Sequence, residues 1–123
     1  MQTLDAVPQN SVSNLKTHQQ AAIASWVQLA KAGDKTAFCQ LYKACYRRLY
    51  LYCLRLCGNE QQAEEVLQES FIKAWQGLSK FRLDAGFYTW LQQIASRVFI
   101  DLLRLKESRI WQNTNSLDEV DFL

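Results

Sequence analysis

The sequence predicts an all-α fold, a compact bundle of about four helices. Apolar residues recur every three or four positions over most of the chain, which is the spacing of one helix face. Only four glycines and one proline occur in 123 residues, too few for a turn-rich β-sandwich. Hydrophobic residues make up 49% and charged residues 21%, so one packed core is expected and wholesale disorder is excluded. The length corresponds to a single domain.

The first predicted helix follows a polar tail. Residues 1–20 contain the single proline, Pro8, and show no apolar period, so we expect a mobile tail there. The tail lacks the basic start and the apolar stretch of a signal peptide. A helix is expected from about His18 to Ala32, closed by Gly33, and its apolar face consists of Ile23, Trp26, Val27 and Ala30.

The second predicted helix has a signal at each end. Asp34 is the expected N-cap, because its carboxylate can accept hydrogen bonds from the exposed N–H groups of the first turn. Gly58 is expected to end the helix in the left-handed conformation. Between them the apolar face keeps a three-and-four spacing through Phe38, Leu41, Tyr42, Cys45, Leu49, Tyr52, Cys53 and Leu56.

The last two predicted helices are joined by a short connection. The third begins after Asn59, an N-cap residue followed three positions later by Gln62. Its buried stripe is predicted to be Ala63, Val66, Leu67, Phe71, Ala74 and Leu78. A connection from Leu78 to Asp84 leads to a fourth helix from about Ala85 to Arg109. Its inner face is predicted to be Phe87, Leu91, Ile94, Ala95, Val98, Leu102 and Leu105.

The four cysteines are expected to be reduced and mostly buried, in a cytoplasmic protein. Cys39, Cys45, Cys53 and Cys57 lie within one predicted helix, where most pairs cannot reach disulfide geometry. Their C-x5-C-x7-C-x3-C spacing is not typical of zinc sites, and the only histidine, His18, is distant in sequence. A metal or redox role, such as oxidant sensing by Cys53 and Cys57, is the alternative.

The sequence predicts neither an enzyme nor a membrane-spanning protein. No run approaches the roughly 18 uncharged apolar residues that a membrane span needs. Paired carboxylates facing a pocket and a Gly-rich phosphate loop, which mark common catalytic sites, are absent from the pattern. No cofactor or metal is therefore expected.

Charge is sorted by segment, although the formal net charge is only +2. From Asn59 to Ile72 there are four acidic residues and no basic one, whereas Arg97 to Arg109 holds four basic residues against two acidic ones. An acidic and a basic surface are therefore expected on different helices. The alternative is that both are ordinary solvated faces, with early-helix Glu favoured by the helix dipole.

One side of the fourth predicted helix favours nucleic-acid binding. Arg97, Asp101, Arg104 and Ser108 stand at i, i+4, i+7 and i+11, so they stack along the same side. Arg can bind phosphates or base edges, while Asp can accept from exocyclic amines or orient a neighbouring Arg.

Upstream of this helix, basic residues alternate with aromatic ones. Lys80 and Arg82 flank Phe81, and Phe87 and Tyr88 follow. This mixture suits a single nucleic-acid strand, because charge follows the backbone and rings stack on bases. The alternative is that the rings belong to the core, above all Phe87, which fits the apolar period.

Three motifs follow one another between Ala32 and Arg109. The first consists of Ala32-Gly33-Asp34, Ala37-Phe38 and Leu41-Tyr42. The second is Ala63-Glu64-Glu65-Val66-Leu67-Gln68-Glu69-Ser70-Phe71-Ile72-Lys73-Ala74-Trp75. The third is Phe87-Tyr88-Thr89-Trp90-Leu91-Gln92-Gln93-Ile94-Ala95, followed by Asp101 and Arg104. In this order and spacing, the segment resembles region 2 of the extracytoplasmic-function (group 4) bacterial sigma factors.

The resemblance implies a transcription initiation subunit without covalent chemistry. In the family, an acidic helix docks on the clamp coiled coil of the largest polymerase subunit, which implies polymerase binding by Glu64, Glu65, Gln68, Glu69 and Lys73. The loop and outer face of the following helix read the −10 promoter element as the strands separate, and one non-template base is held flipped in a pocket, here at Lys80 to Tyr88. The DNA-binding residues implied are Lys80, Phe81, Arg82, Asp84, Phe87, Tyr88, Arg97, Asp101, Arg104, Lys106 and Arg109.

The implied partners are core RNA polymerase, the single non-template strand of −10 promoter DNA and an anti-sigma factor, with no direct membrane insertion. Residues 21–110 would form the region 2 domain, and residues 111–123 would be the acidic start of an interdomain linker. The second helical domain of the family, region 4, does not follow. We therefore expect a truncated piece of a longer protein, and a natural single-domain form is the alternative.

Three residues depart from the family pattern. Arg97 stands where many members have Asn, Glu107 weakens the basic end of the fourth helix, and Glu65 replaces the commoner Asp. Promoter specificity can therefore not be copied from relatives. The first two departures motivate an alternative function, a helical module that binds the polymerase clamp or an anti-sigma factor without opening promoters.

Overall fold

The computed structural model describes the backbone of residues 18–122 and the side chains of residues 18–109. A helix over residues 18–31 is followed by α2 (Lys35–Cys57), α3 (Glu60–Gly77), the short 3-10 helix η1 (Leu78–Lys80) and α4 (Phe87–Phe122). No strand occurs within the described range, and the all-α prediction is confirmed. Of the tail expected at residues 1–20, residues 1–17 lie outside the described residues, while residues 18–20 already belong to the first helix.

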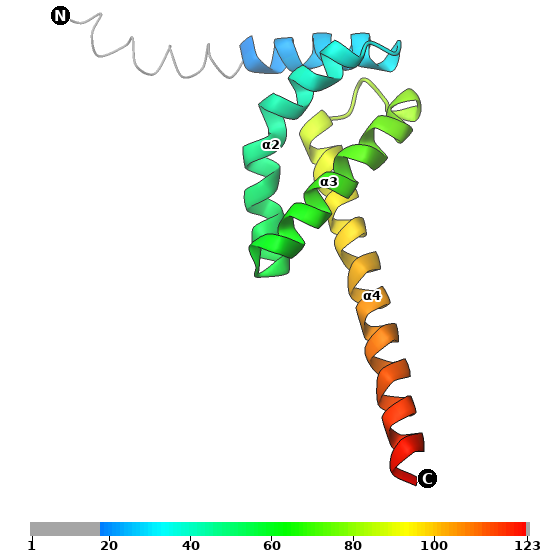
Figure 1. Ribbon diagram of the computed structural model, residues 1–123. Helices are drawn as coiled ribbons and strands as arrows, with labels where there is room; N and C mark the ends of the chain where they lie inside the picture. Colours follow the sequence, from blue (N-terminus) through cyan, green and yellow to red (C-terminus); the bar gives the residue numbers. More distant parts are fainter. Residues whose placement is uncertain (1–17, 123) are drawn as a thin grey trace, which may run out of the picture.

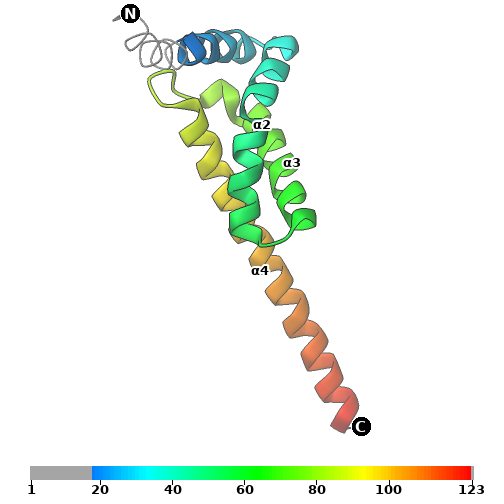
Figure 2. The same cartoon turned by 90° about the vertical axis from the view of Figure 1, so that its left-hand side faces the viewer.

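Three helices form the body of the domain. The antiparallel helices α2 and α3 meet at a tight turn, and α4 packs against both of them (Figure 1). The helix over residues 18–31 lies across the opposite end, next to the loop that leads into α4 (Figure 2). The C-terminal half of α4, orange to red in both views, projects away from the other helices. The loop between η1 and α4 is therefore brought beside the first helix.

The end signals of α2 and α3 act as predicted. The Asp34 carboxylate accepts hydrogen bonds from the N–H groups of Thr36 and Ala37, at 2.9 and 3.2 Å. The Asn59 side chain accepts from the N–H of Gln62 at 2.8 Å, so α3 begins at its expected cap. Gly58 has a φ of 78°, and its N–H donates to the carbonyl of Leu54. These caps fix the sharp reversal between α2 and α3.

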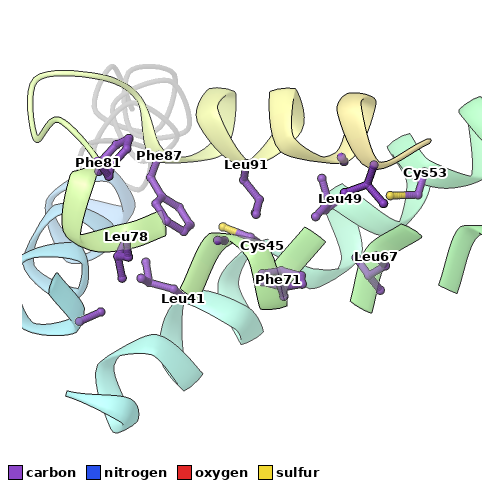
Figure 3. Close-up of a cluster of buried hydrophobic side chains, with 14 of the residues drawn as sticks. Leu41, Cys45, Leu49, Cys53, Leu67, Phe71, Leu78, Phe81, Phe87 and Leu91 are labelled. Carbon is purple, nitrogen blue, oxygen red and sulfur yellow. The ribbon is translucent and has the colours of Figure 1, made fainter. Parts of the chain in front are cut away.

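The core is a continuous apolar cluster between the helices (Figure 3). Along α2 every fourth residue is buried, and α3 and α4 contribute the residues that face this stripe. One polar side chain, Ser70, lies within the cluster, and its hydroxyl donates to the carbonyl of Val66. Between α2 and α4, the hydroxyls of Tyr52 and Ser96 are hydrogen-bonded at 2.6 Å. The main buried residues are Ala37, Leu41, Cys45, Leu49, Cys53, Ala63, Val66, Leu67, Phe71, Ala74, Leu78, Leu91, Ala95 and Val98.

The fourth helix differs from its predicted bounds. It begins at Phe87 rather than Ala85 and continues to Phe122, so residues 111–122, expected to open a linker, have a helical backbone. No glycine or proline follows Gly86, and the chain therefore holds no helix-breaking residue in this range. Within the described residues, no helix is both long and apolar enough to cross a membrane.

The cysteines differ in their exposure. Cys45 and Cys53 are buried, Cys57 is half-buried and Cys39 is exposed, and all four thiols are free. Burial raises the pKa of Cys45 to about 11, although Arg48 opposes the shift, and burial with the neighbouring Cys57 raises the pKa of Cys53 to about 12. Among the described residues no group of three or more His, Cys, Asp or Glu side chains could hold a metal ion.

We predict that iodoacetamide at pH 8 modifies Cys39 of the native protein rapidly and Cys45 and Cys53 slowly. The thiolate is the reacting species, so a raised pKa lowers its fraction at a given pH, and burial limits access as well. The rates at Cys45 and Cys53 should keep rising with pH and level off only near pH 11 and 12, the pKa values of the two thiols. Peptide mapping by mass spectrometry measures the rates, and the urea-unfolded protein, in which all four react alike, is the control. Rapid modification of the native buried pair would contradict this packing.

We predict that Gly58→Ala lowers the free energy of unfolding by about 1 kcal/mol, because a Cβ is disfavoured at positive φ. Gly77→Ala is the matched control. Gly77 has a φ of −93°, and a Cβ there would lie 3.6 Å from the Trp90 ring, an ordinary contact. That variant should be neutral or slightly stabilised. Urea unfolding followed by circular dichroism compares the two variants. Equal losses of unfolding free energy would refute the left-handed conformation of Gly58.

Candidate functional site

The loop into α4 forms one side of a pocket of about 470 Å³, here called the loop pocket. Apolar residues on both sides of the loop anchor it, since Leu78, Phe81 and Phe87 are all buried. The loop itself turns between Arg82 and Ala85, where the N–H of Ala85 donates to the carbonyl of Arg82 at 3.0 Å. The lining residues are Gln20, Ile23, Ala24, Val27, Gln28, Arg48, Phe81, Leu83, Asp84, Ala85, Gly86, Phe87, Tyr88 and Thr89.

The opposite wall of the loop pocket comes from the first helix. Ile23, Val27 and Gln28 line it, and the Lys31 ammonium at the end of that helix donates a hydrogen bond to the carbonyl of Phe81. This bond joins two segments 50 residues apart and holds the start of the loop against the helix. The pocket therefore exists only when the first helix and the loop are packed together.

Two aromatic residues expected to contact bases are instead part of the core. Phe81 and Phe87 are only 4% and 5% exposed, and their ring centroids lie 5.9 Å apart in an edge-to-face arrangement. Trp90 packs on both rings. Their expected role as free stacking platforms is therefore not supported, because a buried ring has no open face. They line the loop pocket and determine where the loop lies.

Tyr88 is half-buried, and one face of its ring is covered. The Arg48 guanidinium carbon lies 3.9 Å from the centroid of the Tyr88 ring, a cation–π contact between α2 and α4. Burial raises the pKa of Tyr88, and the nearby Arg48 opposes this shift. The hydroxyl therefore stays protonated at neutral pH.

The charged residues of the loop lie at the surface. Arg82 and Asp84 form an ion pair at 3.1 Å, with 82% and 71% of their side chains exposed. Such an exposed pair stabilises the fold little, so both groups stay available for other partners. Asp84 lines the loop pocket, whereas Arg82 and the exposed Lys80 lie outside it.

The basic residues predicted on α4 do not share one face. Arg97, Arg104 and Arg109 are exposed, and Arg97 pairs with Asp101 at 3.5 Å. Lys106 instead lines a small cavity of about 50 Å³ with Cys57 and Gln62, at the turn between α2 and α3. Lys106 comes two positions after Arg104, which is more than half a turn of helix, so the two side chains diverge. The implied DNA-binding role of Lys106 is therefore not supported by its position.

The predicted acidic surface lies along a groove of about 430 Å³ between α3 and α4, here called the α3–α4 groove. Four of the five predicted polymerase-binding residues line it: Glu65, Gln68, Glu69 and Lys73. Asp101 lines it too, so this residue faces α3 as well as its Arg97 partner. The floor is apolar and consists of Ile72, Val98, Leu102 and Leu105. An acidic rim over an apolar floor suits a basic amphipathic partner.

The fifth residue, Glu64, lies toward a row of tyrosines. Tyr42, Tyr46 and Tyr50 stand four residues apart on α2, and neighbouring ring centroids lie 5.3 and 6.3 Å apart. Burial raises the pKa of Tyr42 and of Tyr50, and Glu64 raises both further. This aromatic row continues the acidic surface across α2.

Sequence reasoning missed the part of the loop pocket that depends on distant contacts. Arg48 and Lys31 carry no motif, and only tertiary packing places them beside Tyr88 and Phe81. The tyrosine row is visible in the sequence as an i, i+4 spacing, but only Tyr42 is included in the predicted apolar face. Tyr42 and Tyr46 are in fact 36% and 37% exposed.

A protein-family model described as Sigma-70 region 2 matches residues 41–109 of the chain. The curated relatives include the ECF RNA polymerase sigma factor SigW of Bacillus subtilis, 35% identical over 81 residues. Another is the RNA polymerase sigma-H factor of Pseudomonas aeruginosa, 41% identical over 69 residues. These matches cover 66% and 56% of this chain but only 43% and 36% of the relatives' lengths.

Two solved structures are similar in fold. One is an NMR structure of an engineered region 2 of sigmaE in complex with GTAAAA, with a TM-score of 0.67 and 28% identity, covering 71% of this chain and 90% of that one. The other is CnrH in complex with the cytosolic domain of CnrY, with a TM-score of 0.61 and 26% identity, covering 72% of this chain and 62% of that one.

Proposed function

The chain belongs to the Sigma-70 region 2 family, and on that premise we propose that it is the promoter-recognition module of an ECF-type sigma factor. In this role it binds core RNA polymerase and holds unpaired bases of the −10 element during transcription initiation. The observation that carries the proposal is the loop pocket, a partly apolar hollow with exposed basic residues nearby, in a fold shared with a sigma region 2 solved in complex with GTAAAA.

The loop pocket would accept one extruded base of the non-template strand. Extrusion costs a few kcal/mol of stacking and pairing, which contacts in the pocket and on the backbone must offset. Ile23, Val27 and Leu83 supply apolar surface for a flat base, and Asp84 supplies acceptor oxygens at the rim. The buried rings of Phe81 and Phe87 act indirectly, by keeping the loop in place.

Exposed basic residues of the loop and of α4 would neutralise the DNA backbone. Lys80 and Arg82 flank Phe81 at the start of the loop, and Arg97, Arg104 and Arg109 follow along α4. Arg97 is preoriented by its ion pair with Asp101, which favours a directional contact with a phosphate or a guanine edge. Lys106 lies apart from these residues and is left out of the proposed DNA surface.

The α3–α4 groove would bind the clamp coiled coil of the largest polymerase subunit. Glu65, Gln68 and Glu69 offer acceptors to basic residues of a helical partner, while the apolar floor supplies contact area. Exposed tyrosine rings beside Glu64 extend this surface, and aromatic residues are enriched at such interfaces.

We also propose a protein regulator of the anti-sigma class as a partner, supported by the similarity to CnrH, which was solved with the cytosolic domain of CnrY. The role is non-enzymatic and cytoplasmic, as for a subunit that acts with RNA polymerase on DNA.

We predict that the chain binds single-stranded DNA containing GTAAAA more tightly than the same sequence as a duplex. The pocket and the exposed bases can meet only when the strand is unpaired. The logarithm of affinity should fall with the logarithm of salt by about 0.7 for each phosphate neutralised. Fluorescence anisotropy with a labelled oligonucleotide measures the affinity and its salt dependence. A mixed-sequence strand of equal length is the control. Equal affinity for strand and duplex would rule out the melting role.

We predict that Glu65→Lys weakens binding to core RNA polymerase roughly tenfold without lowering the melting temperature, because Glu65 is exposed and lines the α3–α4 groove. Glu107→Lys makes the same charge change on an exposed residue outside the groove and is the control. Biolayer interferometry with immobilised core enzyme compares them. If both variants bind like wild type, the clamp does not use this groove.

A further inference from the structure

We propose that Arg48, on α2, is a further nucleotide-binding residue of the loop pocket, and that its guanidinium binds the phosphate of the extruded nucleotide. The proposal rests on the proposed function and adds to it a residue that the sequence analysis did not place in the DNA-binding set. It identifies the ligand of this position as a backbone phosphate rather than a base edge.

The lining of the loop pocket contains one cationic side chain that could bind a phosphate. Among the residues that line it, Arg48 is the only basic one. Asp84 is the only acidic one, and the nearby Arg82 guanidinium offsets its negative charge. Lys80 and Arg82 can neutralise phosphates beside the pocket, but neither lines it. A nucleotide whose base enters the pocket brings its own phosphate to the rim, where a cation is needed.

The contact with Tyr88 prepares Arg48 for an anion. The guanidinium lies over the ring, with 3.9 Å between its carbon and the ring centroid. A guanidinium carries its N–H donors in a planar fork, and the donors that point away from the ring can match two phosphate oxygens. Within residues 18–109, no carboxylate lies within ion-pair distance of Arg48. No carboxylate therefore neutralises the Arg48 charge among these residues, and the side chain is exposed.

The surroundings of the pair allow such a contact. Tyr88 is half-buried, whereas Arg48 is exposed, so a phosphate can reach the guanidinium from solvent. Because Arg48 covers one face of Tyr88, that face is closed to a base, and the ring serves to hold the arginine.

The test compares Arg48→Gln with Arg47→Gln. Arg47 is the adjacent exposed arginine on α2 and does not line the loop pocket, so its replacement removes the same charge from the same helix. Binding of labelled single-stranded GTAAAA is measured by anisotropy across a range of salt concentrations. We expect Arg48→Gln to lose roughly tenfold in affinity and to flatten the salt slope by about 0.7, while Arg47→Gln changes both much less.

Arg48→Lys separates charge from structure. Lysine keeps the positive charge without the planar fork of donors, so the salt slope should stay near that of wild type although affinity falls. If Arg48→Gln weakens binding with an unchanged slope, Arg48 merely supports Tyr88 and the phosphate contact is wrong. If Arg48→Gln and Arg47→Gln behave alike while wild type binds the strand, the inference fails and the proposed function stands. If wild type binds no single strand, both fail.

Discussion

The surfaces of this domain depend on the buried stripe along α2. Ala37, Leu41, Cys45, Leu49 and Cys53 follow one another at intervals of four residues, and each is at most 4% exposed. Because four residues exceed one turn of helix, the stripe winds slowly around α2, and the same helix buries surface against both α3 and α4. This packing leaves the α3–α4 groove and the loop pocket at different places on the surface of one helical bundle.

The two sites differ in how they are built. The α3–α4 groove takes most of its charges from exposed residues on consecutive turns of α3 and most of its apolar floor from α4. The loop pocket is assembled from three separate parts of the chain, the first helix, α2 and the loop into α4. Two polar contacts hold these parts in register, from Lys31 to the Phe81 carbonyl and from Arg48 to the Tyr88 ring.

Features that depend on local chemistry were predictable from the sequence. Asp34 caps the start of α2 through its side-chain oxygen, and Gly58 ends α2 in the left-handed conformation, which a residue without a Cβ adopts easily. The periodic apolar residues of α3 are buried as expected. Placement across the bundle was not predictable. Arg48 and Tyr88 are forty residues apart, and only the crossing of α2 and α4 brings them together. Lys106 was grouped with Arg104 by charge, although helical geometry already separates them. The site roles of the remaining residues stay predictions.

The position of Lys31 has a practical consequence for defining the smallest working fragment. The region matched by the family model starts at residue 41, ten residues after this lysine and seven after the cap Asp34. A fragment cut at residue 41 would lose the first turns of α2 together with an entire wall of the loop pocket. The functional domain therefore begins before the region that the family model matches. An expression plasmid that starts at residue 41 would encode a protein whose loop into α4 lacks the support of the first helix.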